Sequence, residues 1–386
     1  MKLALFHPWI WLKGGAEKVC LETLKRSKHD IDIFTMVWDK EQSFPEFEDY
    51  KDKIKIIEKN FKMDSFARKG MRAGLKLMFK KIDFSKYDGV IISSGGIGEL
   101  LAIRNHKVPI GIYSHTPLRI LHDKPVIKSN FERIPAYMKA LYVFLAGGYA
   151  ILEKIAWNKF SLVMTNSNNT KQRILDGNLA KDVKVIYPGV DTRKFNYFPN
   201  LERKPYFFVP GRITFHKRPD LAIKSFNLFK EKHPDWYLVL AGNTRAENKD
   251  YINDIYKLAG PRVQIMENVT DEEMVQLYEN AYGTLFMPIN EDFGITPIES
   301  LSCGTPVIAV NEGGVKESVK DGRNGFLVHA NEHSIANKML WAVENQNDWN
   351  AMREKCWLRA QFFDWPNYIS SFDRAVENWL YSEPEE

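Results

Sequence analysis

The chain has 386 residues, of which 44% are hydrophobic and 27% are charged, so its composition is globular and its length favours two domains. Three cysteines, Cys20, Cys303 and Cys356, lie far apart, which argues against a disulfide framework and against a zinc site. The formal net charge of +5 does not indicate a nucleic-acid partner, and we expect none.

The first fifteen residues are apolar but do not read as a signal peptide. Their apolar run contains His7 and Pro8 and ends at Lys13-Gly14-Gly15 rather than at a small-residue cleavage site. We predict a buried first strand here. The longest other apolar stretch, residues 140–152, falls short of the ~20 residues that cross a bilayer. We therefore expect a cytoplasmic protein, soluble or peripheral on the cytoplasmic membrane face.

Residues 59–81 are basic and apolar in alternation. Asp64 is the one acid among eight cations, and phenylalanine, methionine and leucine lie between them. Such a segment can lie on an anionic membrane surface. It can equally be a helix whose apolar side faces its own core. The cations are Lys59, Lys62, Arg68, Lys69, Arg72, Lys76, Lys80 and Lys81.

Apolar strand-like runs alternate with helical stretches along most of the chain, which predicts an α/β fold with parallel sheets. We predict one domain over residues 1–195, a polar linker near 191–205, and a second domain over 205–365. A helical tail, about residues 366–386, is expected to pack back on the first domain. The predicted strands are 2–9, 31–38, 88–94, 108–114, 160–167, 183–189, 205–211, 236–242, 262–267, 283–289, 305–310 and 325–329.

The strongest chemical signal is a pair of glutamates, Glu291 and Glu299, around a Phe-Gly turn. The pattern predicts a helix with Thr296 as N-cap, Pro297 first and Glu299 third, so that a capping box and an anion site form at a strand end. The alternative is that Glu299 only caps the helix. Glu291, in a glycine-containing loop, is harder to explain structurally.

A second signal is Gly211-Arg212 followed by Lys217, at a strand end before a helix. A guanidinium and an ammonium at this edge suit a diphosphate, although surface loops often carry solvated cations. The pair Gly313-Gly314 permits close approach of backbone to a ligand but also suits a plain turn.

In the first domain, Gly14-Gly15 follows the first strand and opens a helix, as a phosphate-binding turn does, but without the spacing of a dinucleotide site or a P-loop. Residues 93–98 form another glycine-rich strand end. His115 follows the strand at 108–114, where it can meet a ligand or bond to backbone as a structural histidine.

Taken in order, these motifs resemble glycosyltransferase family 4, retaining enzymes of the GT-B fold with two Rossmann-like domains facing across a cleft. The resemblance covers most of the chain. It implies that Arg212 and Lys217 neutralise the leaving diphosphate, that Glu299 binds ribose hydroxyls and that Glu291 contacts the transferred sugar. The implied catalytic residues are His115, Arg212, Lys217 and Glu291.

The resemblance implies further contacts on both sides of the reaction. Backbone around Phe293, Gly294 and Ile295 would line the sugar and phosphate, and Asn268-Val269 would lie at the nucleotide base. Acceptor-side contacts would come from Gly14, Gly15, His115 and Arg119, with Gly15 also near the donor.

The segment from His115 to Arg119, with Asp123, resembles mannosyltransferases of polysaccharide and lipid-linked glycan assembly, which implies GDP-mannose as donor and a saccharide or lipid-linked acceptor. The chain shows no Asp-x-Asp at a strand end and no metal-ligand cluster, so we expect neither a metal nor another cofactor. Two other functions stay open. They are a nucleotide-sugar epimerase of the same fold and a non-catalytic relative that binds nucleotide-sugar or carbohydrate.

Overall fold

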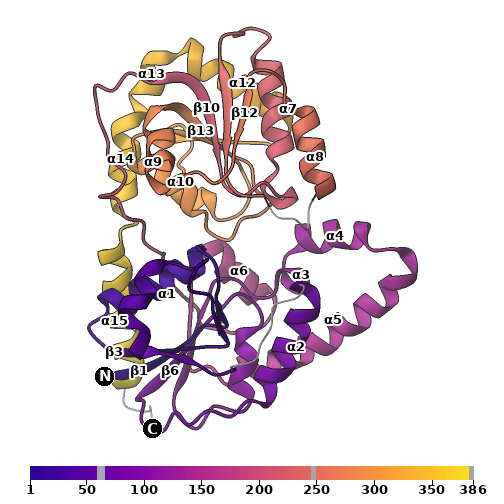
Figure 1. Ribbon diagram of the computed structural model, residues 1–386, viewed down its shortest axis with the longest axis vertical. Coiled ribbons are helices and arrows are strands. Elements are labelled where there is room, and N and C mark those ends of the chain that lie inside the picture. Colours follow the sequence, from indigo (N-terminus) through magenta and orange to yellow (C-terminus); the bar gives the residue numbers. More distant parts are fainter. Residues whose placement is uncertain (59–65, 245–248, 382–386) are drawn as a thin grey trace. The chain divides into compact units, whose positions relative to one another are not determined.

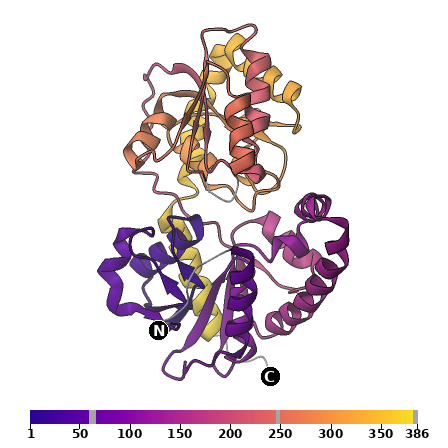
Figure 2. The same ribbon diagram turned by 45° about the vertical axis from the view of Figure 1, so that its right-hand side comes forward.

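The computed structural model describes residues 1–58, 66–244 and 249–381. The chain divides into two compact units, Met1–Gly189 with the segment from Trp365 onward, and Val190–Asp364. Each unit has its own parallel sheet with helices on both faces (Figures 1 and 2), so the predicted α/β class is confirmed. Residues 190–195 lie in the second unit rather than the first, because Val190 N–H donates to Phe363 O at 2.8 Å.

Within the described residues, seven parallel strands form the sheet of the first unit, in the order β5-β3-β1-β6-β7-β8-β9. The apolar runs become strands because side chains on both faces are buried, as in β6, where all six residues are inaccessible. The strands are β1 (Lys2–Phe6), β3 (Asp30–Thr35), β5 (Ile54–Ile56), β6 (Gly89–Ser94), β7 (Ile110–Ser114), β8 (Leu162–Thr165) and β9 (Lys184–Val185), with a small sheet of β2 (Trp9–Ile10) and β4 (Val37–Trp38).

Helices cover both faces of this sheet. One face packs on α1 (Gly15–Arg26) and on the C-terminal helix α15 (Trp365–Tyr381). Tyr368 of α15 bonds to Thr23 of α1 through their hydroxyls, 2.9 Å apart. The other face packs on α2 (Phe66–Phe79), η2 (Gly98–Ile103), α5 (Ala136–Trp157) and α6 (Asn168–Asp176). The short helix η1 (Pro45–Lys53) packs Phe47 into the core of the first face, and α3 (Arg119–His122) and α4 (Lys124–Arg133) follow β7.

The described part of the second unit holds a six-stranded parallel sheet in the order β12-β11-β10-β13-β14-β15. Its core is aromatic, with Phe207, Phe226, Phe229 and Trp349 fully buried. The strands are β10 (Lys204–Pro210), β11 (Tyr237–Ala241), β12 (Val263–Met266), β13 (Ala281–Phe286), β14 (Val307–Val310) and β15 (Gly325–Val328). The helices are η3 (Phe215–Lys217), α7 (Pro219–Phe229), α8 (Lys249–Leu258), α9 (Asp271–Asn280), α10 (Ile295–Ser302), α11 (Val315–Ser318), α12 (Glu332–Glu344), α13 (Gln346–Asn350) and α14 (Met352–Gln361).

Both sheets reverse their strand order at one point, between β1 and β6 in the first unit and between β10 and β13 in the second. Where the order reverses, the loops after the two central strands turn to opposite faces and leave a crevice at the carboxyl edge, where open α/β sheets bind ligands. The segments that the sequence singles out, after β6 and β10 and after β13, begin at these two crevices.

Two segments that the sequence singled out, the apolar stretch 140–152 and the basic segment 59–81, need separate comment. The apolar stretch 140–152 belongs to the 22-residue helix α5, which is long and apolar enough to cross a membrane by length and composition. In the basic segment, residues 59–65 lie outside the described residues. The described end of α2 buries Ala73 and Leu77 in the core, and Lys76 Nζ donates to Glu58 at 3.0 Å.

Candidate active site

The segment after β10 brings two predicted cations to the crevice of the second sheet. Gly211 ends the strand with a φ of +119°, which favours glycine, and the exposed Arg212 follows it. The short helix η3 then carries Lys217 to a small pocket that Gly211 and Arg212 also line, with Phe286 of β13 on its other side. The strand end therefore places both cations beside β13.

Glu291 reaches the same place from the loop after β13. Ile289 N–H donates to His216 O at 2.9 Å, which ties this loop to η3. Lys217 Nζ then forms an ion pair with Glu291 Oε1 at 2.9 Å, and each side chain keeps a quarter of its surface exposed. Two residues assigned from separate motifs, 74 positions apart, thus form one contact that remains open to a competing ligand.

The Gly313-Gly314 pair packs against the loop that carries Glu291. Gly314 N–H donates to Glu291 O at 2.8 Å. A Cβ atom on Gly313, whose φ is +72°, would lie 2.4 Å from Glu291 O, and one on Gly314 would lie 2.3 Å from Asp292 O. The glycines are required by a close approach of backbone to backbone, which fixes the position of Glu291.

The helix after this loop begins earlier than predicted. Gly294, with a φ of +88°, is the N-cap of α10, so the predictions of Thr296 as N-cap and of Pro297 as first helical residue are wrong. Glycine enters the left-handed region without steric cost, which lets the chain turn into the helix at once. Pro297 then occupies the third helical position, where its missing N–H costs no hydrogen bond. Phe293 is buried, its ring 5.6 Å from that of Phe363.

Glu299 consequently lies in the second turn of α10 and forms no capping box. Its Oε2 accepts a hydrogen bond of 2.8 Å from the hydroxyl of Tyr278, a fully buried residue of α9. Burial raises the pKa of Glu299, while the Tyr278 hydroxyl and the charge of Lys194 oppose that rise. The capping explanation of Glu299 is thereby removed, and its carboxylate is oriented by a tyrosine instead.

Asn268 and Val269 follow β12, which lies two strands from β10 in the sheet. Asn268 is exposed with a φ of +56°, and its N–H donates to Asn243 Oδ1 at 3.1 Å. Asn243 itself follows β11, so this hydrogen bond joins two neighbouring loops of the carboxyl edge.

In the first unit, the partly exposed His115 bonds to the buried Ser93, at the crevice between β1 and β6. The Ser93 hydroxyl bonds to His115 Nε2 at 2.8 Å and to His7 Nδ1 at 3.1 Å, and it accepts from Cys20 Sγ at 3.2 Å. Burial lowers the pKa of His7 to about 4 and that of His115, also beside His7, to about 3. Both imidazoles are therefore neutral near pH 7.

His7 was not assigned to the site from the sequence, where it served only to argue against a signal peptide. Its position directly after the first strand was the available signal, because parallel strands end at a common edge. Ser93 lay within the glycine-rich segment that was singled out, but nothing in the sequence marked it as the partner of both histidines.

Gly14 and Gly15 form the start of α1 at the same edge. Gly14 is the N-cap, without a side-chain hydrogen bond, and Gly15 is the exposed first residue of the helix. A Cβ atom on Gly14 would lie 2.3 Å from Oε2 of Glu17, a buried acid of the first turn. A side chain at position 14 would displace the Glu17 carboxylate, whereas position 15 is open to solvent.

Arg119 is held by a buried carboxylate. Its guanidinium bonds to Asp123 Oδ2 at 2.9 Å, and Arg173 Nη2 contacts the same oxygen at 2.9 Å. Arg173 also donates to the Thr116 hydroxyl at 2.6 Å. The 115–123 segment is therefore locked in shape by two arginines on one buried aspartate, and Arg119 serves that arrangement first.

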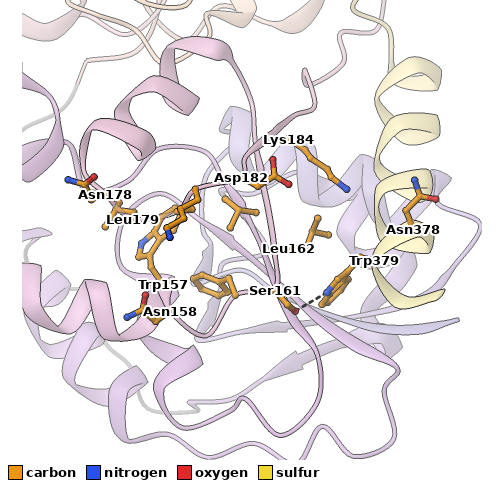
Figure 3. A pocket seen from close by; sticks show the side chains of 14 residues that line it. Trp157, Asn158, Ser161, Leu162, Asn178, Leu179, Asp182, Lys184, Asn378 and Trp379 are labelled. Carbon is orange, nitrogen blue, oxygen red and sulfur yellow. Dashed lines mark hydrogen bonds between the residues drawn. The ribbon is translucent and has the colours of Figure 1, made fainter. Parts of the chain in front are cut away.

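A hollow of about 590 Å³ in the first unit lies away from this edge (Figure 3). Ser161 and Leu162, at the amino end of β8, line it together with Trp379 of α15, whose indole N–H donates to Ser161 Oγ at 2.8 Å. Among the described residues, no group of three or more histidine, cysteine, aspartate or glutamate side chains is placed to hold a metal ion.

Comparison with known proteins gives two family matches that together span residues 13–356. The family described as Glycosyltransferase Family 4 matches residues 13–194, and that described as Glycosyl transferases group 1 matches residues 191–356. The alpha-1,3/1,6-mannosyltransferase ALG2 of Dictyostelium discoideum is 24% identical over 87% of this chain and 88% of its own. That of Saccharomyces cerevisiae is 25% identical over 89% and 75%.

Solved structures share the fold at low identity. Sucrose-phosphate synthase from Thermosynechococcus elongatus has a TM-score of 0.74 at 16% identity, covering 99% of this chain and 100% of its own. Anabaena HepE in complex with UDP and glucose has a TM-score of 0.71 at 16% identity, covering 98% and 99%. At this identity the likeness establishes the fold alone.

Proposed function

We infer the reaction from the premise that this chain belongs to glycosyltransferase family 4 and is a glycosyltransferase of the GT-B type. We propose that it transfers mannose from GDP-mannose to a hydroxyl of a saccharide or lipid-linked acceptor, with retention and without a metal. The observation that carries the proposal is the Lys217–Glu291 ion pair, 2.9 Å long, at the crevice of the second sheet beside Arg212.

When the donor binds, its diphosphate takes the place of Glu291 as the partner of Lys217. A diphosphate carries two negative charges and competes with Glu291 for Lys217, while Arg212 supplies a second cation on the same segment. Glu291 then turns to the hydroxyls of the transferred sugar. The free N–H groups at the start of α10 add a positive dipole end next to this position.

The proposed bond changes balance without a side-chain nucleophile. The bond between the anomeric carbon and the phosphate oxygen breaks, and the acceptor oxygen bonds to that carbon on the same face. The acceptor's proton passes to the leaving phosphate oxygen. Positive charge grows on the sugar ring and negative charge on the phosphate, which Lys217 and Arg212 stabilise in place of a metal ion.

The first unit contributes uncharged contacts to the transferred sugar in this proposal. His115, held neutral by burial and by the neighbouring His7, meets the sugar as a hydrogen-bonding group without adding positive charge near the ring. Gly15 offers an exposed backbone N–H at the start of α1. Acceptor-side contacts come from Gly14, Gly15, His115 and Arg119.

The choice of mannose follows the names of the relatives and the 115–123 segment, in which Arg119 and Asp123 are bonded to each other. A second candidate donor is UDP-glucose, because the HepE structures, which share this fold, hold UDP with glucose or UDP-glucose. In this proposal the exposed Asn268 contacts the base through its main chain, which does not by itself select guanine or uracil.

The proposal is tested by measuring nucleoside-diphosphate release from GDP-mannose, UDP-glucose and UDP-N-acetylglucosamine, each with and without a chelator. We expect release from GDP-mannose that persists with chelator, and an NMR spectrum of the product with the donor's anomeric configuration. Release from a UDP-sugar alone would transfer the proposal to that donor. Conversion of a donor without release would indicate an epimerase, and binding without either would indicate a non-catalytic relative.

A further inference from the structure

The helical hairpin of α4 and α5 is the part of the first unit whose apolar side chains are least covered. Figures 1 and 2 show the two helices extending from the body of the unit, joined by a turn at Ile134-Pro135. Only 17% of the most apolar 18-residue window of α5 is buried. The exposed apolar side chains are Tyr137, Met138, Leu141, Val143, Phe144, Leu145, Ile151 and Ile155, with Phe131 on α4.

This exposure is of the kind that a water-soluble surface avoids. Phe144 is 77% exposed and Tyr137 84%, and they belong to one continuous helix rather than to scattered positions. A core helix of a soluble protein would be mostly buried, and a signal sequence would lie at the N-terminus, whereas α5 begins at Ala136. The hairpin therefore has an apolar surface that a partner of low polarity would cover.

The exposed apolar side chains of α5 form one face of the helix. At 100° per residue, seven of the eight lie within an arc of about 140°, and Val143 lies outside it. A helix that lies in the plane of a membrane interface presents an apolar face of this kind to the lipid.

Charge on the hairpin fits the surface of an anionic bilayer. Residues 134–152 contain no acid and one cation, Lys139, whose ammonium lies 4.6 Å from the centre of the Phe131 ring. Lys128 on α4 and Lys154 at the far end of α5 are exposed, as is one acid, Glu132. Lysines at the ends of an apolar segment reach anionic headgroups while the apolar side chains enter the interface.

Both ends of the hairpin are fastened to the first unit, which excludes a crossing of the bilayer. The α4 end is held by Asp123 with Arg119 and Arg173, and the α5 end by Glu153, which bonds to His122 at 2.6 Å. Helix α4 has ten residues and spans about 15 Å, half of the ~30 Å hydrocarbon core. The hairpin can therefore enter one leaflet but cannot return from the other side.

We propose that the α4–α5 hairpin docks the first unit on an anionic membrane, lying in one leaflet with α5 among the headgroups and upper acyl chains. The element is distinct from the basic segment 59–81. It also connects with the site, because Tyr149 of α5 donates to Glu99 at 3.0 Å and to Gly96 O in the glycine-rich loop after β6. A membrane-bound hairpin thus holds the carboxyl edge of the first sheet near the lipid surface.

The test is sedimentation of the full chain with vesicles of phosphatidylcholine and phosphatidylglycerol. We expect binding that Leu141→Ser with Phe144→Ser weakens at least about tenfold, since two large apolar side chains leave the interface. The matched control is Phe198→Ser with Leu358→Ser, which removes the same residue types, 48% and 56% exposed, from the second unit. Leu75→Ser with Phe79→Ser tests α2, where these residues are 50% and 64% exposed.

A second readout places one residue directly in the lipid. The native cysteines are all buried, so Phe144→Cys provides a single accessible position for an environment-sensitive fluorophore. We expect its emission to shift to the blue on addition of vesicles, and that of a Leu358→Cys label to stay unchanged. Melting temperature and nucleoside-diphosphate release without vesicles should equal those of the wild type in all of these variants.

Three outcomes would overturn the proposal. In the first, the wild type sediments neither with phosphatidylcholine vesicles nor with the mixed vesicles. In the second, the α5 variant binds as strongly as the wild type. In the third, only the α2 variant loses binding. A lipid-free dimer that the α5 variant dissociates, with no blue shift at position 144, would instead assign the hairpin to contact with a second copy of this chain.

Discussion

The carboxyl edges of the two sheets carry their polar groups in different states. In the first unit, His7 and His115 both bond to the Ser93 hydroxyl, and burial keeps both imidazoles neutral. In the second unit, Lys217 and Glu291 form an ion pair with a quarter of each side chain exposed. The second edge is thus built to exchange an internal charge for a charged ligand, and the first to present hydrogen bonds without charge.

Among the substitutions that test this difference, we expect the largest effect at Lys217. We expect Lys217→Ala to lower kcat/KM for nucleoside-diphosphate release about a hundredfold, or about 3 kcal/mol, because a preorganised cation is lost from the leaving phosphate. The melting temperature should hardly change, since a partly exposed ion pair adds little stability. Lys224→Ala, which removes the partner of Asp220 on α7, is the control. Equal rates in the two variants would remove Lys217 from the reaction.

A glycine pair tests whether the second edge depends on the position of the Glu291 loop. Gly313 and Gly322 have φ values of +72° and +70°, but only Gly313 faces backbone, that of Glu291. Gly322→Ala should cost about 1 kcal/mol of stability from backbone strain, and Gly313→Ala about 2–3 kcal/mol with loss of turnover. Urea unfolding and donor release measure both. Similar losses for the two variants would argue against a supporting role of Gly313.

Because His7 is neutral in the folded chain, we expect folding stability to fall as the pH is lowered. The pKa of His7 is about 4 when folded and about 6.5 when unfolded, so the unfolded chain binds more protons between these values and stability falls as pH falls. From pH 7 to pH 5 the loss is about 2 kcal/mol. Urea unfolding of His7→Gln should lack this part of the loss, and a slope equal to that of the wild type would contradict a neutral His7.

Glu99, in the same unit, changes the folding stability with pH in the opposite direction. Burial, together with the Glu153 carboxylate, raises the pKa of Glu99 to about 7, so the folded chain binds the extra proton and stability rises as pH falls toward 4.5. In Glu99→Gln this compensation is absent. The variant should lose more stability than the wild type between pH 7 and pH 5, measured by the same unfolding experiment.

The smallest expected effect concerns how Glu299 is held. Tyr278→Phe removes the 2.8 Å bond that orients Glu299, and nucleotide affinity should fall about fivefold, the equivalent of about 1 kcal/mol. Tyr282→Phe is the matched control, because it removes a buried hydroxyl bonded to Ala342 O in the same unit, away from Glu299. Titration calorimetry with GDP and UDP compares them. Equal affinity in both would return Glu299 to a purely structural role.

The sequence predicted most of the strands because parallel strands buried on both faces are written as continuous apolar runs, as in residues 88–94 and 305–310. It also placed Arg212, Lys217 and Glu291 correctly at strand ends. The contact between Lys217 and Glu291, 74 residues apart, was not predictable, because it depends on the pairing of β10 with β13 in the sheet.

Two other features were predicted incorrectly because of local sequence signals. The start of α10 was misplaced because Thr296 and Pro297 form a good capping pattern, whereas the backbone turns at Gly294, whose conformation the pattern ignores. The length of α5 was underestimated because Lys139 and Glu153 bound its apolar run at 140–152. In the structure Lys139 packs on an aromatic ring and Glu153 is buried, so neither ends the helix.

The connection between the units makes the second one an insertion with adjoining ends. Val190, where the chain enters it, forms a parallel bridge with Asp364, where the chain leaves. On the other side of the connection, a Cβ atom on Gly189 would lie 2.6 Å from Cα of Trp365, so those two ends also adjoin. A gene could therefore lose, gain or exchange residues 190–364 as a single cassette, and a short linker from Gly189 to Trp365 would close the remaining chain without a gap.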